Sequence, residues 1–140
     1  MAFAAREVHK RYVAVVQGLL RGAPDGAWSV IDLPLMPDWP NRPLSKVDHE
    51  HGKPSLTRWR VLAHDEAGDT TRLALEPVTG RSHQLRLHLQ AIGHPILGDA
   101  LYAPPVVQAL APRLLLHASD ITLPHPATGE PLSLHSAVPF

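Results

Sequence analysis

The order of apolar and polar positions along the chain predicts strands over most of its length. Six runs are rich in β-branched, aromatic and aliphatic side chains, which suit the half-buried surface of a sheet. These runs cover residues 11–20, 28–35, 55–65, 71–79, 114–123 and 131–139. Short turn segments separate the third run from the fourth and the fifth from the sixth, so each of these two pairs is predicted to form an antiparallel hairpin.

Residues 84–90 fit two kinds of element. Polar and apolar side chains alternate there, which is typical of a strand. However, Ser82 suits a helix N-cap, Gly93 suits a helix end, and Leu85 and Leu89 would share one helical face. The residues alone leave both interpretations open.

Two further helical segments are predicted. Residues 2–10 contain helix-forming residues without an N-cap before them, as in the last turns of a helix, and we therefore expect missing sequence upstream. Pro104 and Pro105 suit the first turn of a short helix that ends near Ala109.

Residues 36–54 are proline-rich and poor in apolar side chains, and we expect a long functional loop there. The sum is a single α+β domain over residues 1–140, with a mostly antiparallel sheet and about two helices.

Composition excludes only a few classes of function. Apolar residues make up 44% of the chain, which is enough for a core, and no apolar run is long enough to cross a bilayer. Thirteen basic and thirteen acidic side chains cancel, so charge permits RNA binding without implying it. The chain has no cysteine, which excludes disulfides and thiolate metal ligands, and we expect a cytoplasmic protein. The spacing of the ten histidines matches no metal motif, so no metal site is expected.

Two groups of residues suggest contacts with an anion or a base. Arg81 and Arg86 flank the start of the ambiguous segment, where a helix N-terminus would attract an anion; the alternative is a solvated helix face with a structural ion pair. Trp39 and Arg42 lie among prolines, where they would stack on a base or hold a phosphate; the alternative is a stiff surface loop.

The aspartates carry no such signal. Asp32, Asp38, Asp48 and Asp99 lie near the informative segments, and each is interpreted as a turn or cap residue.

Four segments together resemble the RluA-type family of RNA pseudouridine synthases, in the branch acting on 23S rRNA and tRNA. They are KRYVAVVQG (10–18), LPLMPDWPNRPLSKV (33–47), GRSHQLRLHLQAIGHPILGD (80–99) and PRLLLHASDITLPHP (112–126). The resemblance spans essentially the whole chain and favours a helix at residues 84–90. It implies isomerisation of uridine to pseudouridine without a cofactor, on a base flipped out of the RNA.

The resemblance also assigns roles to residues. Tyr12 matches the tyrosine that packs on the flipped base, although it also fits a half-buried strand tyrosine. Arg86 matches the arginine that pairs with the catalytic aspartate. The remaining members are expected to contact RNA or support the site: Arg81, His83, Gln84, Trp39, Arg42 and Lys46.

One part of the family pattern is missing. The nucleophilic aspartate belongs to an HRLD-type motif upstream of the tyrosine strand, and no aspartate here follows an Arg-Leu pair. We therefore expect the C-terminal part of a catalytic domain, lacking the N-terminal half and inactive alone. The alternatives are a non-catalytic RNA-binding module and a half-domain that self-associates through an exposed sheet edge.

Overall fold

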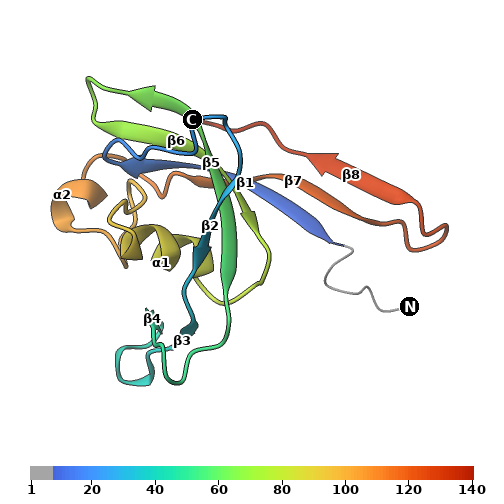
Figure 1. The fold of residues 1–140 in the computed structure, drawn as a ribbon, viewed down its shortest axis with the longest axis horizontal. Coiled ribbons are helices and arrows are strands. Elements are labelled where there is room, and N and C mark those ends of the chain that lie inside the picture. The colour runs from blue at the N-terminus through green and yellow to red at the C-terminus, as the bar shows by residue number, and fades with distance from the viewer. Residues whose placement is uncertain (1–7) are drawn as a thin grey trace.

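The computed structural model describes residues 8–140, and its centre is a six-stranded antiparallel sheet (Figure 1). The strand order is β2-β5-β6-β1-β7-β8. The bounds are His9–Gln17 for β1, Ser29–Asp32 for β2, Leu56–Asp65 for β5, Thr70–Pro77 for β6, Leu116–Pro124 for β7 and Pro131–His135 for β8. Each of these strands overlaps one of the six runs, although the runs at residues 28–35 and 131–139 extend beyond β2 and β8. The prediction of a mostly antiparallel α+β fold is confirmed.

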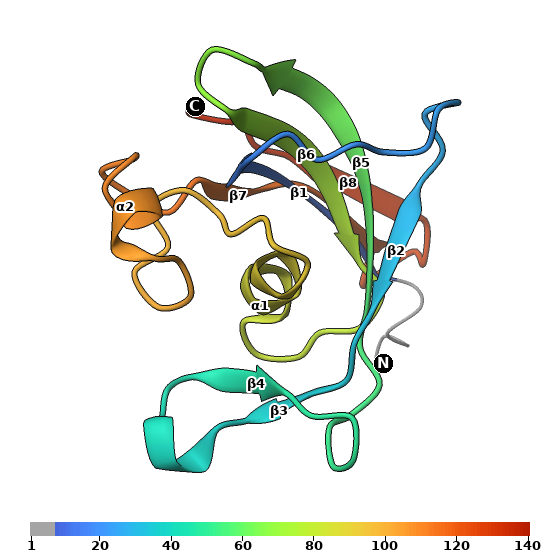
Figure 2. The ribbon, with the colours of Figure 1, turned by 60° about the vertical axis from the view of Figure 1, so that its left-hand side comes forward.

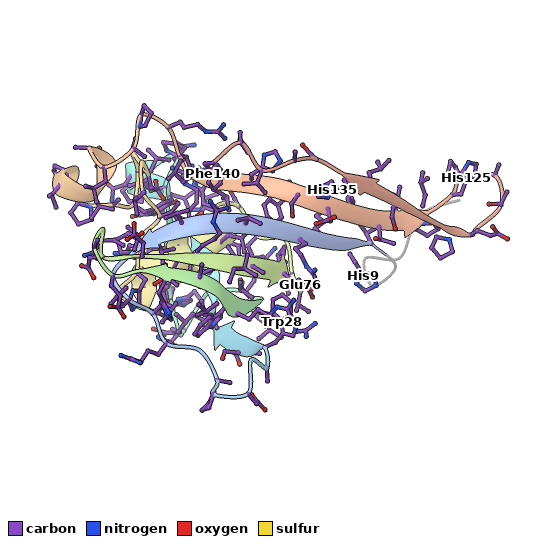
Figure 3. All side chains as sticks on the ribbon, turned by 90° about the horizontal axis from the view of Figure 1, so that it is seen from above. His9, Trp28, Glu76, His125, His135 and Phe140 are labelled. Carbon is purple, nitrogen blue, oxygen red and sulfur yellow. The ribbon has the colours of Figure 1, made fainter. Side chains whose placement is uncertain are left out.

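Both predicted hairpins are present, and one of them projects from the molecule. Strands β5 and β6 pair antiparallel, as do β7 and β8. The β7–β8 pair extends beyond the rest of the sheet, and Figure 3 shows His125 at its far tip.

The expectation of a loop over residues 36–54 was wrong in its first part. Strands β3 (Leu35–Pro37) and β4 (Ser45–Val47) form a separate two-stranded sheet, with a 3-10 turn at Trp39–Asn41 between them. Proline is tolerated because Pro37 ends its strand, and a two-stranded sheet consists only of edges. We call residues 35–47 the β3–β4 hairpin.

The predicted helix over residues 2–10 falls mostly on residues 1–7, which lie outside the described residues. For His9 and Lys10 the prediction was wrong, because both belong to β1. This strand pairs with β6 on one side and β7 on the other, and His9 is already in register with Thr122. Pairing on two sides overrides the weak helical preference of these residues.

Residues 84–90 form a helix, as the resemblance favoured. Helix α1 (Gln84–Ala91) lies against one face of the sheet, within its curve (Figure 2). Leu85 and Leu89 pack with sheet residues such as Ala14 and Leu75, and Leu89 is fully buried. The helix interpretation prevails because an i, i+4 pair presents both leucines to the sheet. The N-cap is His83, with φ of 57°, and not Ser82.

The short second helix was predicted correctly. Helix α2 (Pro105–Gln108) begins at a proline and ends with Ala109 as its C-cap. Of the helices within residues 8–140, neither is long and apolar enough to cross a membrane.

A buried chain of hydrogen bonds fastens α1 to the sheet. His88 is fully buried, with Nδ1 2.8 Å from the Thr57 hydroxyl and Nε2 2.8 Å from the Leu33 carbonyl oxygen. Since a carbonyl only accepts, Nε2–H donates to Leu33 and Nδ1 accepts from Thr57. The hydroxyl oxygen of Thr57 in turn accepts from the Gln84 side chain at 3.0 Å. Burial lowers the pKa of His88 despite the opposing contact with Leu33, so the ring stays neutral.

The state of His88 predicts a pH dependence of stability. In the unfolded chain a histidine titrates near a pKa of about 6.5, whereas the folded chain binds this proton less readily. The unfolded state therefore gains protons first, and the free energy of unfolding falls as the pH drops below about 6.5. His88→Gln keeps a donor and an acceptor but does not titrate. The free energy of unfolding of this variant, measured with urea between pH 5 and 8, should therefore depend less on pH than that of the unchanged protein. An equal dependence in both proteins would contradict this.

Candidate functional site

A hollow opens beside the start of β1, where β6 ends and α1 begins. Its volume is about 430 Å³. Tyr12 contributes to its wall together with Lys10, Arg81 and Gln84, so two cations and one half-buried aromatic ring meet there. Tyr12 also packs against the core that includes Leu85. The structure thus brings together the tyrosine of the first strand and part of the motif at residues 80–99.

Gln84 shapes this hollow through its internal bonds. It is 4% exposed, and its carboxamide oxygen accepts from the Thr79 hydroxyl at 2.7 Å and from the Arg81 amide at 3.1 Å. Its carboxamide nitrogen donates to the Leu56 carbonyl at 2.8 Å and to the Thr57 hydroxyl at 3.0 Å. Two donors and two acceptor positions are all that a glutamine has. Gln84 therefore has no polar group left for a ligand and acts by positioning its neighbours.

Arg81 lies between the hollow and the β3–β4 hairpin. Its Nε and one terminal nitrogen donate to the Pro54 carbonyl at 3.2 and 2.9 Å. The residue lines the hollow and also a second depression formed by Met36, Ser45 and Lys53. This guanidinium is held by a neutral oxygen, so its positive charge is available to an anion at either depression.

Arg86 has a carboxylate partner that the sequence did not suggest. Its Nε and one terminal nitrogen lie 3.1 and 2.5 Å from the two oxygens of Asp99. Asp99 is fully buried and also accepts from the amides of Leu101 and Tyr102. Burial opposes ionisation of this carboxyl, but the hydrogen bonds from Arg86 and the two amides outweigh it, and the pKa of Asp99 is lowered. The predicted turn role of Asp99 is thus confirmed. Arg86 forms an ion pair, as in the structural alternative, and its predicted role beside a catalytic aspartate stays a prediction.

The turn that carries Asp99 requires a glycine before it. Gly98 has φ of 77°, and a Cβ atom at this position would collide with the carbonyl group of Arg113. Both the backbone conformation and the close approach exclude a side chain.

Tyr102 joins the polar side of α1, and sequence reasoning missed it. The Arg86 guanidinium lies 5.5 Å from its ring centre, and the His83 ring meets it edge-on at 5.4 Å. His83 Nδ1 is 2.7 Å from the Tyr102 hydroxyl. Burial first and the Arg86 charge second lower the pKa of His83. His83 and Arg86 therefore both contact Tyr102, and neither lines the hollow.

The remaining predicted residues lie on the β3–β4 hairpin. Trp39 is 60% exposed, and the Arg42 guanidinium lies 5.1 Å from its ring centre. Lys46 is exposed, and its Nζ lies 3.8 Å from a carboxylate oxygen of the half-buried Asp48, a long ion pair. The structure groups Trp39 with Arg42 at the turn of the hairpin and places Lys46 on β4.

Comparisons with known proteins agree with this arrangement. The family model described as RNA pseudouridylate synthase matches residues 1–91, well over half of the chain. The chain belongs to this family. It is 50% identical over 138 residues to a protein of Escherichia coli (strain K12) named dual-specificity RNA pseudouridine synthase RluA, and equally similar to its namesake from Pasteurella multocida (strain Pm70). Each alignment covers 99% of this chain and 61% of the relative, so the chain spans about three fifths of the length of these curated relatives.

A solved structure supports the same family and fold. Human RNA pseudouridylate synthase domain containing 1 superposes with a TM-score of 0.78 at 31% identity. The superposition covers 96% of this chain and 56% of the human one. The chain thus shares its fold with this solved pseudouridylate synthase domain.

The ion pair of Arg86 gives a prediction about stability. Asp99→Asn keeps the size of the side chain but leaves a largely buried guanidinium without its counter-charge, which should cost roughly 3 kcal/mol of unfolding free energy. Asp48→Asn is the matched control, because its partner Lys46 is exposed and distant, and it should have a much smaller effect. Urea unfolding at pH 7 measures both; equal losses would contradict the role given to Asp99.

Proposed function

We propose that this chain forms the uridine-binding side of an RNA pseudouridine synthase active site, with Tyr12 packing on the flipped base. The observation that carries the proposal is the hollow in which Tyr12 lies with Lys10 and Arg81. An aromatic face stacks on any base, and the two cations suit the flanking phosphates. The substrate is a uridine in a loop of rRNA or tRNA, as the resemblance implies.

The hairpin extends this surface. Trp39 and Arg42 are exposed at its turn, and a tryptophan stacked with a guanidinium suits contact with an unpaired base or its phosphate. Arg81 adds positive charge at the depression between the hairpin and the hollow, and Lys46 adds an exposed positive charge on β4. In this role His83 and Gln84 support the surface from within, through their bonds to Tyr102 and to the loop at Thr79.

The chemistry of isomerisation needs a further group. No carboxylate is among the described residues that line the hollow. The carboxylate next to the motif, Asp99, is fully buried and bound to Arg86 and two backbone amides, so it is unavailable as a nucleophile. The family aspartate that follows an Arg-Leu pair has no counterpart in these 140 residues, since the three Arg-Leu pairs are followed by Ala74, His88 and Leu115. We infer that these 140 residues bind RNA but do not isomerise uridine by themselves.

The absence of turnover is directly testable. The purified chain, incubated with tRNA or rRNA transcripts labelled with tritium at uridine C5, should release no tritium above background, because neither Tyr12 nor Arg86 replaces a carboxylate. The E. coli relative serves as the positive control under the same conditions. Release of tritium by the 140-residue chain would overturn the inference.

A second experiment tests the role of Tyr12. Tyr12→Ala should weaken binding of a uridine-containing hairpin RNA by roughly tenfold, since stacking on an aromatic ring contributes about 1–3 kcal/mol per base. Tyr12→Phe keeps the stacking face and should bind within about twofold of the unchanged protein. Fluorescence anisotropy at fixed salt measures all three. Equal weakening by both substitutions, or by neither, would argue against stacking on Tyr12.

Two further features of the proposal concern partners and location. Strand β8 is an edge of the sheet, and Leu134 on it is 53% exposed, so self-association through this edge is the second candidate role. An rRNA or tRNA substrate agrees with action in the cytoplasm.

A further inference from the structure

One hydrogen bond connects the β3–β4 hairpin to a distant part of the chain. The Ser45 amide donates to the Tyr102 hydroxyl at 2.8 Å, across 57 positions of sequence. Within the described part of the chain, the other hydrogen bonds of residues 35–47 stay inside residues 34–53. Ser45 is 8% exposed, so water does not readily replace this bond. The bond to the Tyr102 hydroxyl is therefore a direct tie between the hairpin and the turn after α1, beside the link that runs from Leu35 through Lys53 and Pro54 to Arg81.

The bond from Ser45 leaves the hydroxyl proton of Tyr102 available for a second partner. Because the Tyr102 oxygen accepts from the Ser45 amide, its single proton is free to donate to Nδ1 of His83 at 2.7 Å. A neutral His83 with its ring proton on Nε2 accepts this proton at Nδ1, and burial lowers the pKa of His83, which favours the neutral ring. The hydroxyl thus joins β4 to the residue that caps α1.

The ring of Tyr102 is held from the side of α1. Arg86 lies over the ring at 5.5 Å, and Asp99 accepts the Tyr102 backbone N–H at 3.1 Å while it holds Arg86. The tyrosine is therefore fixed by the helix, and the hairpin is fixed by the tyrosine.

We propose that Tyr102 is a positioning residue that holds the Trp39–Arg42 turn of the hairpin at a set place relative to the hollow beside Tyr12. The proposal rests on the proposed function, because it treats the hollow and the hairpin as two parts of one RNA-binding surface. An RNA that engages both parts gains from their fixed spacing, since a mobile hairpin would have to be ordered on binding.

The test is Tyr102→Phe, which keeps the ring against Arg86 and His83 and removes only the hydroxyl. Hydrogen exchange of the Ser45 amide, followed by NMR, should accelerate at least about tenfold, because the amide loses its acceptor. Affinity for a uridine-containing hairpin RNA should fall by roughly threefold to tenfold, the effect of one lost hydrogen bond. Thr122→Val is the matched control: it removes an exposed hydroxyl on the β7–β8 hairpin and should change neither value.

A double-mutant cycle separates positioning from a general loss of stability. If Tyr102 acts through the hairpin turn, Tyr102→Phe should have little further effect on RNA affinity in a Trp39→Ala background. Full additivity of the two losses would overturn the proposal. So would unchanged exchange at Ser45, or faster exchange with unchanged affinity.

The outcomes also distinguish this proposal from the function on which it rests. If the unchanged protein binds no RNA, the proposed function fails, and exchange at Ser45 alone decides whether Tyr102 holds the hairpin. If the unchanged protein binds RNA and Tyr102→Phe binds equally well, the function stands and the positioning role is refuted.

Discussion

The four hydrogen bonds of the Gln84 carboxamide are the constraint on which the rest of the site depends. They tie the first residue of α1 to Thr79 and Arg81 in the preceding loop and to Leu56 and Thr57 on β5. Thr57 passes the connection to His88, one helical turn further on. An eight-residue helix has little stability of its own, so its place on the sheet is set by these buried bonds together with its leucines. The position of α1 on the sheet therefore sets the direction of its side chains.

Helix α1 and its N-cap contribute side chains to two sides of the molecule. Toward the hollow it presents Gln84 and Leu85 beside Tyr12; toward the β3–β4 hairpin it presents His83 and Arg86. Arg86 donates to Asp99 through Nε and one terminal nitrogen, and a guanidinium has five N–H donors. Three donors of Arg86 therefore remain for a second carboxylate, the partner that the sequence resemblance implies for this residue.

The sequence predicted elements well and long-range partners poorly. Periodicity located the six strands of the main sheet because each buries one face or two, and the proline pair located α2. The prediction from periodicity failed at β3 and β4, because three-residue strands carry no periodic signal. The predicted helix was also wrong at His9, where pairing of β1 with β6 and β7 overrides the local helical preference. Residues 84–90 satisfy both the polar–apolar alternation of a strand and the leucine spacing of a helix, and only the family resemblance favoured the helix.

The candidate site shows the same division. Tyr12, Arg81 and Gln84 were named from the motifs, and the structure places all three at one hollow. The partner of Arg86 and the part played by Tyr102 were not predictable, because Asp99 lies 13 positions and Ser45 lies 57 positions from the residues they bind. No local pattern encodes such pairs. The sequence likewise did not indicate that all hydrogen-bonding positions of the Gln84 carboxamide are occupied, because its partners come from β5 and from the loop before α1.

The central claim is that RNA binds across the hollow and the hairpin, and chemical-shift mapping of the backbone amides tests it most directly. On titration with a uridine-containing hairpin RNA, the account predicts shifts at Lys10 and Tyr12, at residues 79–81 and at residues 39–46. The opposite face of the sheet provides the contrast. Arg58, which alternates with the buried Thr57 and Trp59, is paired there with Glu76 and lies 4.9 Å from the Trp28 ring centre. Figure 3 labels Trp28 and Glu76 near each other. Shifts concentrated around Trp28 and Arg58, with none at Tyr12, would contradict the account.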